Sequence, residues 1–590
     1  DGARNIMCSS SDAKIQNDKS VLLDAYKKCE VLEDSNMAIF SLSSVLTDRA
    51  EPSESLFTNV SWFSSHDPII LSENAIPYFL SNKTDLLYAG KKEMNGKRPQ
   101  CYIIHKAELL GKSAECWEQI FDVDYDVTKL IQLESEITNR EQAVKLLIKD
   151  IADTEAKLEE NIKAADGIQS TKNEISALHH RTNVMFNIMR GGIFANGGKI
   201  SIKDFLKFVN QRNIPLVAKF EGYVKTAAAN GDLVNYGDFA SLVKNINDPQ
   251  FTRLFLEYMP LTFSRRHGDP SRPWNIFNIV LKDREGNPIL NYEGNWRDIF
   301  QNWEALVYSY PEYIKNMSTK FLNAMTPDGF NPYKINRQGI DWEIPDPTNP
   351  WAQIGYWGDH QVIYFEKLLE FYNKTKRAEL LASVNEKIYT SANVPYRIKS
   401  YADIVKNPRV TIEFDRELSD ALKAAEAAKG SDAKLVQGAD GNPYLVSFAA
   451  KALQIVICKI ANFIPAGGIW LNTQRPEWND ANNALAGYGL SVVTLCYLYR
   501  YIAQLAEIFE STDVAAVTLP SAVKKCFCDL VALYSGEDAA ACAKDDKARK
   551  AFVEKAGKIF EAERNDLYKN GYTGEEELKC AEIASALKLI

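Results

Sequence analysis

The chain has 590 residues, of which 46% are hydrophobic and 25% charged, with a formal net charge of -9. This composition is typical of a folded globular protein, and the length predicts two or three domains. The acidic balance argues against a nucleic-acid partner, because phosphate backbones require a basic surface, although a local anion pocket stays compatible with it. No run approaches the roughly 20 apolar residues that cross a bilayer. We therefore expect a soluble protein without a membrane partner, with the cytoplasm as the favoured compartment.

The ten cysteines show no paired CxxC spacing. Cys526 and Cys528 form only a CxC, and no histidine lies near them in sequence. Because zinc sites need more ligands at tighter spacings, we expect free thiols, no metal and no organic cofactor.

The first 260 residues predict two regions. Residues 1–127 mix short β-prone runs (55–63, 101–104) with turn residues, which indicates an α+β region or a β-sandwich remnant. Residues 128–260 are expected to form long linker helices, because apolar residues recur at three- and four-residue steps, with a break near Gly167. The glycine pairs at 191–192 and 197–198 lack phosphate-loop spacing and a following GKS/T.

From residue 261 the pattern changes to amphipathic helices separated by long loops rich in Gly, Pro, Asn, Asp and Trp. Four such helices are predicted at 296–310, 359–372, 446–463 and 490–509. We also expect a surface helix and turn over 417–441, and further helices to residue 590. Long loops between helices are uncommon unless they carry function, so residues 261–590 are the expected functional domain.

Eight of the ten tryptophans lie between Trp274 and Trp478, most of them in predicted loops. Flat apolar rings among Asp, Asn, Arg and Gln suit a sugar, whose C–H faces stack on aromatics and whose hydroxyls need directional partners. The alternative is that these tryptophans anchor the packing of the loops.

Four clusters within the loops carry candidate site residues. The first holds three arginines and a histidine that could bind phosphate, or could form structural ion pairs with Asp269. The second lies at a helix start, where the dipole also favours an acid. The third precedes another helix that Asp359 could cap, and has too few ligands for a metal. By cluster, the residues are Arg265, Arg266, His267 and Arg272; Arg297, Asp298 and Gln301; Trp357, Asp359, His360 and Gln361.

The fourth cluster is Glu477-Trp478-Asn479-Asp480, in which two acids three residues apart flank a tryptophan. An acid that an apolar wall keeps protonated is the usual donor of a proton to a glycosidic oxygen. Capping acids at a helix start are the alternative interpretation.

Glu477-Trp478-Asn479-Asp480-Ala481-Asn482-Asn483 resembles the Asp-Trp-Asn-Asp-Gly-Met-Asn-like motif of the inverting disaccharide phosphorylases of the cellobiose and chitobiose phosphorylase family. Trp296-Arg297-Asp298, followed by Gln301, resembles that family's Phe-Arg-Asp-Gln-like motif. The resemblance covers about residues 260 to 510. The resemblance implies a catalytic domain that is an (α/α)6 toroid. In it, Asp480 would be the general acid, Trp478 would line a sugar subsite and Asp298 would bind the glycone sugar.

The chain departs from the family's pattern at two motif positions, where Glu477 replaces Asp and Ala481 replaces Gly. Only 110 residues follow Asp480, so the last helices of a complete toroid are expected to be missing.

The expected function is thus that of an inverting enzyme acting on a di- or oligosaccharide, with Glu477 beside the acid Asp480. A phosphorylase would use inorganic phosphate as co-substrate and nucleophile. A hydrolase would need a second carboxylate about 6.5 to 9.5 Å from the first, and the candidates are Glu293, Asp341, Glu343 and Asp359. Alternatives are a non-catalytic carbohydrate-binding or scaffold protein and a helical interaction protein, and a homo-oligomer is compatible with each.

Overall fold

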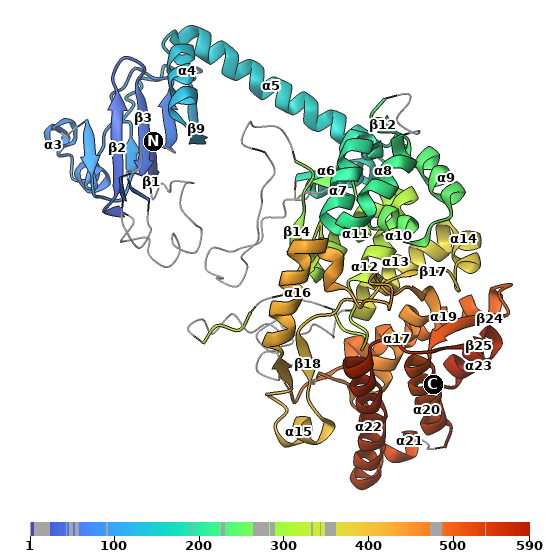
Figure 1. Cartoon of the computed structure of the whole chain (residues 1–590). Coiled ribbons are helices and arrows are strands. Elements are labelled where there is room, and N and C mark those ends of the chain that lie inside the picture. The colour runs from blue at the N-terminus through green and yellow to red at the C-terminus, as the bar shows by residue number, and fades with distance from the viewer. Residues whose placement is uncertain are drawn as a thin grey trace. The chain divides into compact units, whose positions relative to one another are not determined.

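The computed structural model describes residues 2–4, 24–42, 44–45, 51–52, 58–89, 92–189, 193–225, 231–262, 283, 289–331, 334–342, 344–347, 361–471, 487–536 and 539–590. The chain is mainly helical, as predicted, with several small sheets (Figure 1). It divides into two compact units, residues 1–159 and 160–590, with the division inside helix α5 (Arg140–Ala164). The sequence had suggested boundaries near residues 127 and 260.

The first unit is built on a five-stranded antiparallel sheet of order β7-β2-β3-β6-β9. The central strand β3 is buried at every position, because both faces of the sheet are covered. Ala38 and Phe40 pack on one face, whereas Met37 and Ile39 pack on the other, towards Ile137 of α4. The strands of this sheet are β2 (Lys27–Leu32), β3 (Met37–Leu42), β6 (Thr58–Phe63), β7 (Glu93–Asn95) and β9 (Gln119–Tyr125), and the helix beside it is α4 (Val127–Ile137).

The second unit contains the four amphipathic helices predicted after residue 261, and their existence is confirmed. α17 is buried at all of its positions, as its apolar run predicts, and the side chain of Ser447 caps its first turn. Gly167 lies in the predicted break, between α5 and α6 (Glu174–Met189). The four helices are α11 (Trp296–Ser309), α13 (Gln361–Thr375), α17 (Phe448–Ile460) and α19 (Val492–Ser511).

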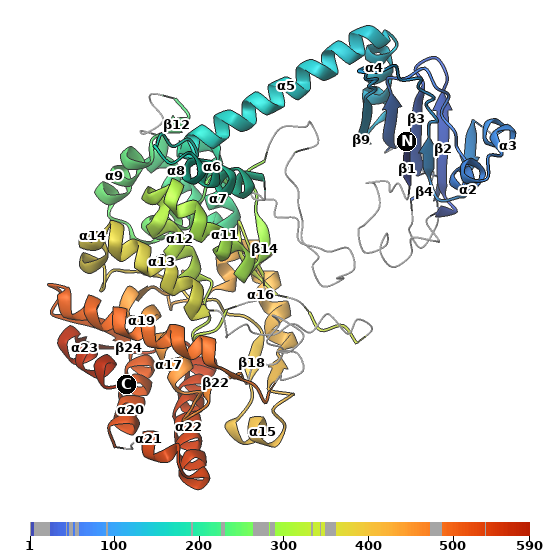
Figure 2. The same ribbon diagram turned by 180° about the vertical axis from the view of Figure 1, so that it is seen from behind.

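The second unit contains further helices, most of which are labelled in Figure 2. They are α7 (Ile202–Arg212), α8 (Val217–Lys225), α9 (Tyr236–Ile246), α10 (Pro249–Glu257), α12 (Ile314–Asn323), α14 (Arg377–Ala382), α15 (Tyr401–Lys406), α16 (Arg416–Lys429), α20 (Ser521–Gly536), α21 (Ala539–Cys542), α22 (Asp546–Asn570) and α23 (Cys580–Leu589). The predicted surface helix and turn over 417–441 are present, as α16 and an exposed turn in which Gly441 N–H donates to the Gly438 carbonyl. Between them lies a 3-10 turn that the sequence did not predict, η5 (Ser431–Lys434), which is buried throughout. Its charged side chains are ion-paired inside the unit.

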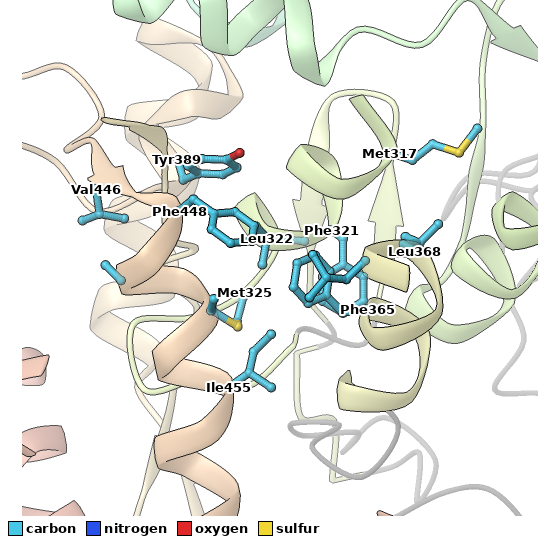
Figure 3. Close-up of a cluster of buried hydrophobic side chains, with 14 of the residues drawn as sticks. Met317, Phe321, Leu322, Met325, Phe365, Leu368, Tyr389, Val446, Phe448 and Ile455 are labelled. Carbon is cyan, nitrogen blue, oxygen red and sulfur yellow. The ribbon is translucent and has the colours of Figure 1, made fainter. Parts of the chain in front are cut away.

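The second unit contains an apolar cluster where α12, α13 and α17 meet (Figure 3), and α19 packs against α13 beside it. Phe365 of α13 lies 5.0 Å from Phe321 of α12 and 5.9 Å from Tyr501 of α19, measured between ring centroids. The Phe448 ring of α17 lies 6.4 Å from that of Phe365. One aromatic side chain therefore joins four helices that are far apart in sequence.

In the described part of the chain, α19 alone is long and apolar enough to cross a membrane by length and composition, which we did not expect from the sequence. Of its most apolar window, 44% is buried within the unit. There it packs against α13 and α23, as a core helix does.

Candidate functional site

Most of the predicted site residues lie outside the described residues, so the structure neither joins nor separates them. Arg297 and Asp298 are in the first turn of α11 and Gln361 begins α13, but their side chains are not described either. Gln301, one turn further along α11, is exposed. The predicted residues outside the described part are Arg265, Arg266, His267, Arg272, Trp357, Asp359, His360, Glu477, Trp478, Asn479 and Asp480.

The structure does describe the helices that follow these clusters, so their directions can be compared. Helices α11 and α13 run in the same direction. Trp296, the first residue of α11, lies 6.1 Å from Tyr364 in the first turn of α13, between ring centroids. Further along both helices, Lys367 Nζ donates to Glu304 at 3.0 Å. The two helix starts are therefore neighbours.

Helix α19 runs in the direction of α13 as well. The contact between Phe365 and Tyr501 is followed, about two turns later, by a hydrogen bond of 3.1 Å from Asn373 to Glu507. We call the end of the unit at which α11, α13 and α19 begin its amino end.

The segment that holds the Glu477–Asp480 motif is attached at this amino end. Strand β22 (Gly468–Trp470) pairs with β23 (Leu490–Ser491), and β23 leads directly into α19. Leu471 N–H donates to the Gly489 carbonyl at 3.0 Å. The described residues on either side of segment 472–486, Leu471 and Gly487, therefore lie close together beside the first turn of α19, and the segment itself lies outside the described residues.

Three of the four described tryptophans between 274 and 478 support the packing alternative. The fourth, Trp470 on β22, is half-buried and its indole N–H donates to the Gly487 carbonyl at 2.9 Å. Trp296 and Trp303 are in α11 and only 1% exposed, and Trp342 is buried with its indole N–H donating to Ser419 Oγ at 3.1 Å. The sugar-stacking hypothesis is therefore wrong for these three. Trp274, Trp351, Trp357 and Trp478 lie outside the described residues.

Two of the four carboxylates considered as a catalytic base are paired with lysines. Glu293, on β14 (Glu293–Asn295), forms an ion pair with Lys334 of β15 (Lys334–Asn336). Asp341, on β16 (Gly339–Asp341), has its Oδ1 3.8 Å from Lys434 Nζ. The sheet β14-β15-β16 leads directly into α11, so both acids lie near its start, and each already has a lysine partner. Glu343 and Asp359 are outside the described residues.

A buried acid that the sequence did not single out is Glu563 of α22, which is 4% exposed. Burial raises its pKa to about 8, with Asp328 raising it further and the Cys526 thiol and Gln454 amide favouring the ionised form. Neither carboxylate oxygen makes a well-aligned hydrogen bond. A buried neutral acid beside another carboxylate is a frequent catalytic pattern. Asp328 is 0% exposed as well, so a substrate cannot reach either acid. We therefore regard Glu563 and Asp328 as part of the protein interior and not as a catalytic pair.

A second missed cluster is the buried ion network of Arg212, Arg253, Glu257 and Asp432. Arg253 donates to Glu257 at 3.1 Å and to Asp432 at 2.5 Å. Burial by itself would raise the pKa of Glu257, but the two guanidinium groups outweigh it and lower this pKa to about 2. Charges compensated in this way hold helices together and offer no free group for chemistry.

Lys320, adjacent to this network on α12, donates to the Arg337 carbonyl at 3.2 Å. Burial, with repulsion from Arg212, lowers its pKa to about 7. The space between Lys320, Asn323 and Glu257 is only about 10 Å³, which at most suits a water molecule.

A larger groove of about 490 Å³ lies between α19, α23 and the end of α17. Leucine, isoleucine and alanine side chains dominate its lining, with Tyr499 and Tyr534, and its acids Glu507 and Glu510 are already ion-paired. Such a lining does not suit a sugar, which needs several free polar partners.

Within the described ranges, no group of three or more His, Cys, Asp and Glu side chains is placed to hold a metal ion. No protein-family model and no curated protein matches this sequence. The likeness to the disaccharide phosphorylases therefore rests on the two short motifs alone.

Proposed function

We propose that this protein is a carbohydrate-active enzyme, an inverting glycoside phosphorylase or hydrolase that acts on a di- or oligosaccharide. Its site would lie at the amino end of α11, α13 and α19, with Asp480 as the general acid. The observation that carries this proposal is the common direction of the three helices, since each of them follows a segment with a predicted cluster.

The packing of α12 supports a toroid of helical hairpins. Phe321, near the end of α12, lies 4.5 Å from Trp296 and 5.0 Å from Phe365, which are near the starts of α11 and α13. At the other end, Lys376 Nζ donates to the Glu312 carbonyl at 3.3 Å. α12 thus runs against both neighbours, and in a ring of hairpins alternate helices necessarily share a direction.

The chemistry of the proposed site follows from what each cluster offers. Asp480 would donate its proton to the glycosidic oxygen while Trp478 lines the sugar subsite. Asp298, Asp359 and Gln361 would bind hydroxyls. In a phosphorylase, the arginine cluster at 265–272 would hold phosphate, and the helix N-termini at the same end favour an anion.

The test is turnover of a panel of di- and oligosaccharides by the full chain, with and without inorganic phosphate. We expect Asp480→Asn to lower turnover by about 10²- to 10⁴-fold, the usual contribution of a general acid, with sugar affinity unchanged. Glu477→Gln is the matched control in the same motif and should lose less. A melting temperature equal to that of the wild type shows that each variant is folded.

Four outcomes distinguish the possible functions. Turnover that needs phosphate indicates a phosphorylase, and turnover without phosphate indicates a hydrolase. Glycan binding without turnover across the panel would reject the enzyme and indicate a carbohydrate-binding or scaffold protein. Neither binding nor turnover would reject a role with sugars altogether.

A further inference from the structure

Residues 174–246 contain two helix–loop–helix units that meet through their loops. The first is α6 followed by α7, and the second is α8 followed by α9. Strand β11 (Ile200–Ser201) of the first loop pairs antiparallel with β12 (Leu233–Val234) of the second, with Ile200 opposite Val234. Each of the following helices begins two residues after this pair, α7 at Ile202 and α9 at Tyr236. The two units are thus related by an approximate two-fold repeat.

This geometry is that of a paired EF-hand, in which a 12-residue loop has a glycine at position 6 and an acid at position 12. Gly198, with φ of 83°, precedes Asp204 by the required six residues. Ile200 is then position 8, and its partner Val234 is position 8 of the second loop. The acid Asp238 consequently falls at position 12 of the second loop, whereas its position 6 is Asp232, with the glycine one residue earlier at Gly231.

Neither loop has the side chains that bind calcium. Positions 1, 3 and 5 of an EF-hand supply side-chain oxygens, and Ca²⁺ takes six to eight oxygen ligands in all. Here each of these six positions in the sequence is an alkyl residue or a glycine, so none of them can supply a side-chain oxygen. They are Ile193, Ala195 and Gly197 in the first loop and Ala227, Ala229 and Gly231 in the second.

A carboxylate of the second loop instead connects the two loops directly. Asp232 accepts hydrogen bonds from Ser201 Oγ at 2.6 Å and from Lys203 N–H at 2.9 Å. Its backbone carbonyl accepts from Ile202 N–H at 2.9 Å. Asp232 therefore satisfies amide groups at the start of α7 that would otherwise lack partners.

The position-12 carboxylate of the first loop binds another part of the chain. Asp204 accepts from Tyr258 OH at 2.7 Å and from Arg337 Nη2 at 2.6 Å. Arg337 is 2% exposed, and its guanidinium carbon lies 5.7 Å from the centre of the Phe208 ring. It belongs to the turn between β15 and β16, in the sheet that leads into α11.

The apolar surface between the helices of the pair is filled by the chain itself, through α10. Phe251 of α10 lies 4.7 Å from Phe220 of α8 and 5.9 Å from Phe205 of α7, between ring centroids. Phe255, one turn later, lies 5.5 Å from Phe239 of α9. α10 thus takes the place that a target helix takes in a calcium sensor.

From these contacts we infer that residues 174–246 are a calcium-independent EF-hand pair that acts as an internal clamp. Asp204 holds Arg337, and α10 fills the groove, so the pair ties the β15–β16 turn to the helical unit without an ion. The inference is independent of any activity on sugars.

The first test is the melting temperature of the full chain in excess calcium and in excess chelator, together with calorimetric titration of calcium. We expect the same melting temperature in both conditions and no binding heat. A calcium-dependent rise in melting temperature, or a measurable calcium affinity, would overturn the inference.

The second test compares the two position-12 acids. Asp204→Asn should lower the melting temperature by about 2 °C or more, since a buried charge-assisted bond is lost. Asp238→Asn is the matched control, because Asp238 is exposed and should tolerate the change. Equal effects of the two substitutions would reject the clamp.

If Asp204→Asn fails to fold, Tyr258→Phe removes only one of the two hydrogen bonds to Asp204. A lower melting temperature is expected for this variant too. A Tyr258→Phe variant as stable as the wild type would count against the clamp.

Discussion

Arg212 Nη2 and Glu257 Oε2 lie 2.5 Å apart, and both side chains are 2% exposed. The two residues come from α7 and α10, so this ion pair joins the EF-hand pair to the helix in its groove. Asn323 of α12 donates to the other oxygen of Glu257 at 2.8 Å. Glu257 thus compensates two buried arginines, as Asp432 also does, and in addition binds a third helix.

Glu257→Gln should lower the free energy of unfolding by about 3 to 5 kcal/mol, because Arg212 and Arg253 would keep their charges inside the protein with less compensation. Urea denaturation of the variant and the wild type measures the difference. Glu507→Gln is the control: its ion pair with Arg377 is about half exposed and should contribute about 0 to 1 kcal/mol. Similar losses in the two variants would contradict the importance of the buried network.

Glu563 should make stability decrease with pH. The pKa of Glu563 in the folded protein is about 8, above its ordinary value of 4.5. Its contribution to the free energy of unfolding is therefore fully present below pH 4.5 and is lost as the pH rises from 4.5 through 8. Unfolding free energy should fall by up to about 1.4 kcal/mol per pH unit in this window. Glu563→Gln stays neutral and should make this slope smaller without abolishing it, because the buried Glu366, whose pKa burial also raises to about 8, contributes a slope of the same sign. Denaturation at pH 5 to 9 measures the difference.

The control for this experiment is Glu554→Gln on the same helix, because Glu554 is exposed at the surface. It should keep the pH dependence of the wild type. If Glu563→Gln keeps the full pH dependence of the wild type as well, then the carboxyl group of Glu563 is ionised in the folded protein and the assignment of a neutral Glu563 is wrong.

Phe365→Ala should cost about 3 to 5 kcal/mol of unfolding free energy, since it leaves a cavity where four helices meet. Thermal or urea denaturation provides the measurement. Tyr499→Ala, at a side chain 78% exposed on α19, should change stability by no more than about 0.5 kcal/mol. A loss below about 1 kcal/mol at Phe365 would show that the helices do not depend on this contact.

The helices of the second unit could be predicted because their signals are local. Apolar periodicity placed α11, α13, α17 and α19 within two residues of their observed starts. Ser447 and Ser491 cap α17 and α19 through hydrogen bonds to amides three residues later, a pattern that is visible in sequence.

The candidate site could be predicted only as four separate stretches of sequence. That α11, α13 and α19 share a direction depends on contacts such as Trp296 with Tyr364, which span dozens of residues along the chain. The EF-hand pair was missed for another reason. The glycine and the acid of the first loop are spaced correctly, but position 6 of the second loop is Asp232, and the ligand residues by which such loops are usually recognised are absent from positions 1, 3 and 5 of both loops.

By itself, the sequence determined the mainly helical class and the positions of the long helices, because periodicity and capping act between residues a few positions apart. Only the tertiary structure decided which charges are buried. Asp432 follows an alanine-rich, charged helix and looks like a surface acid, yet it pairs inside the protein with Arg253, 179 residues away. Burial of a charge depends on the arrival of a distant partner, and no local pattern encodes that partner.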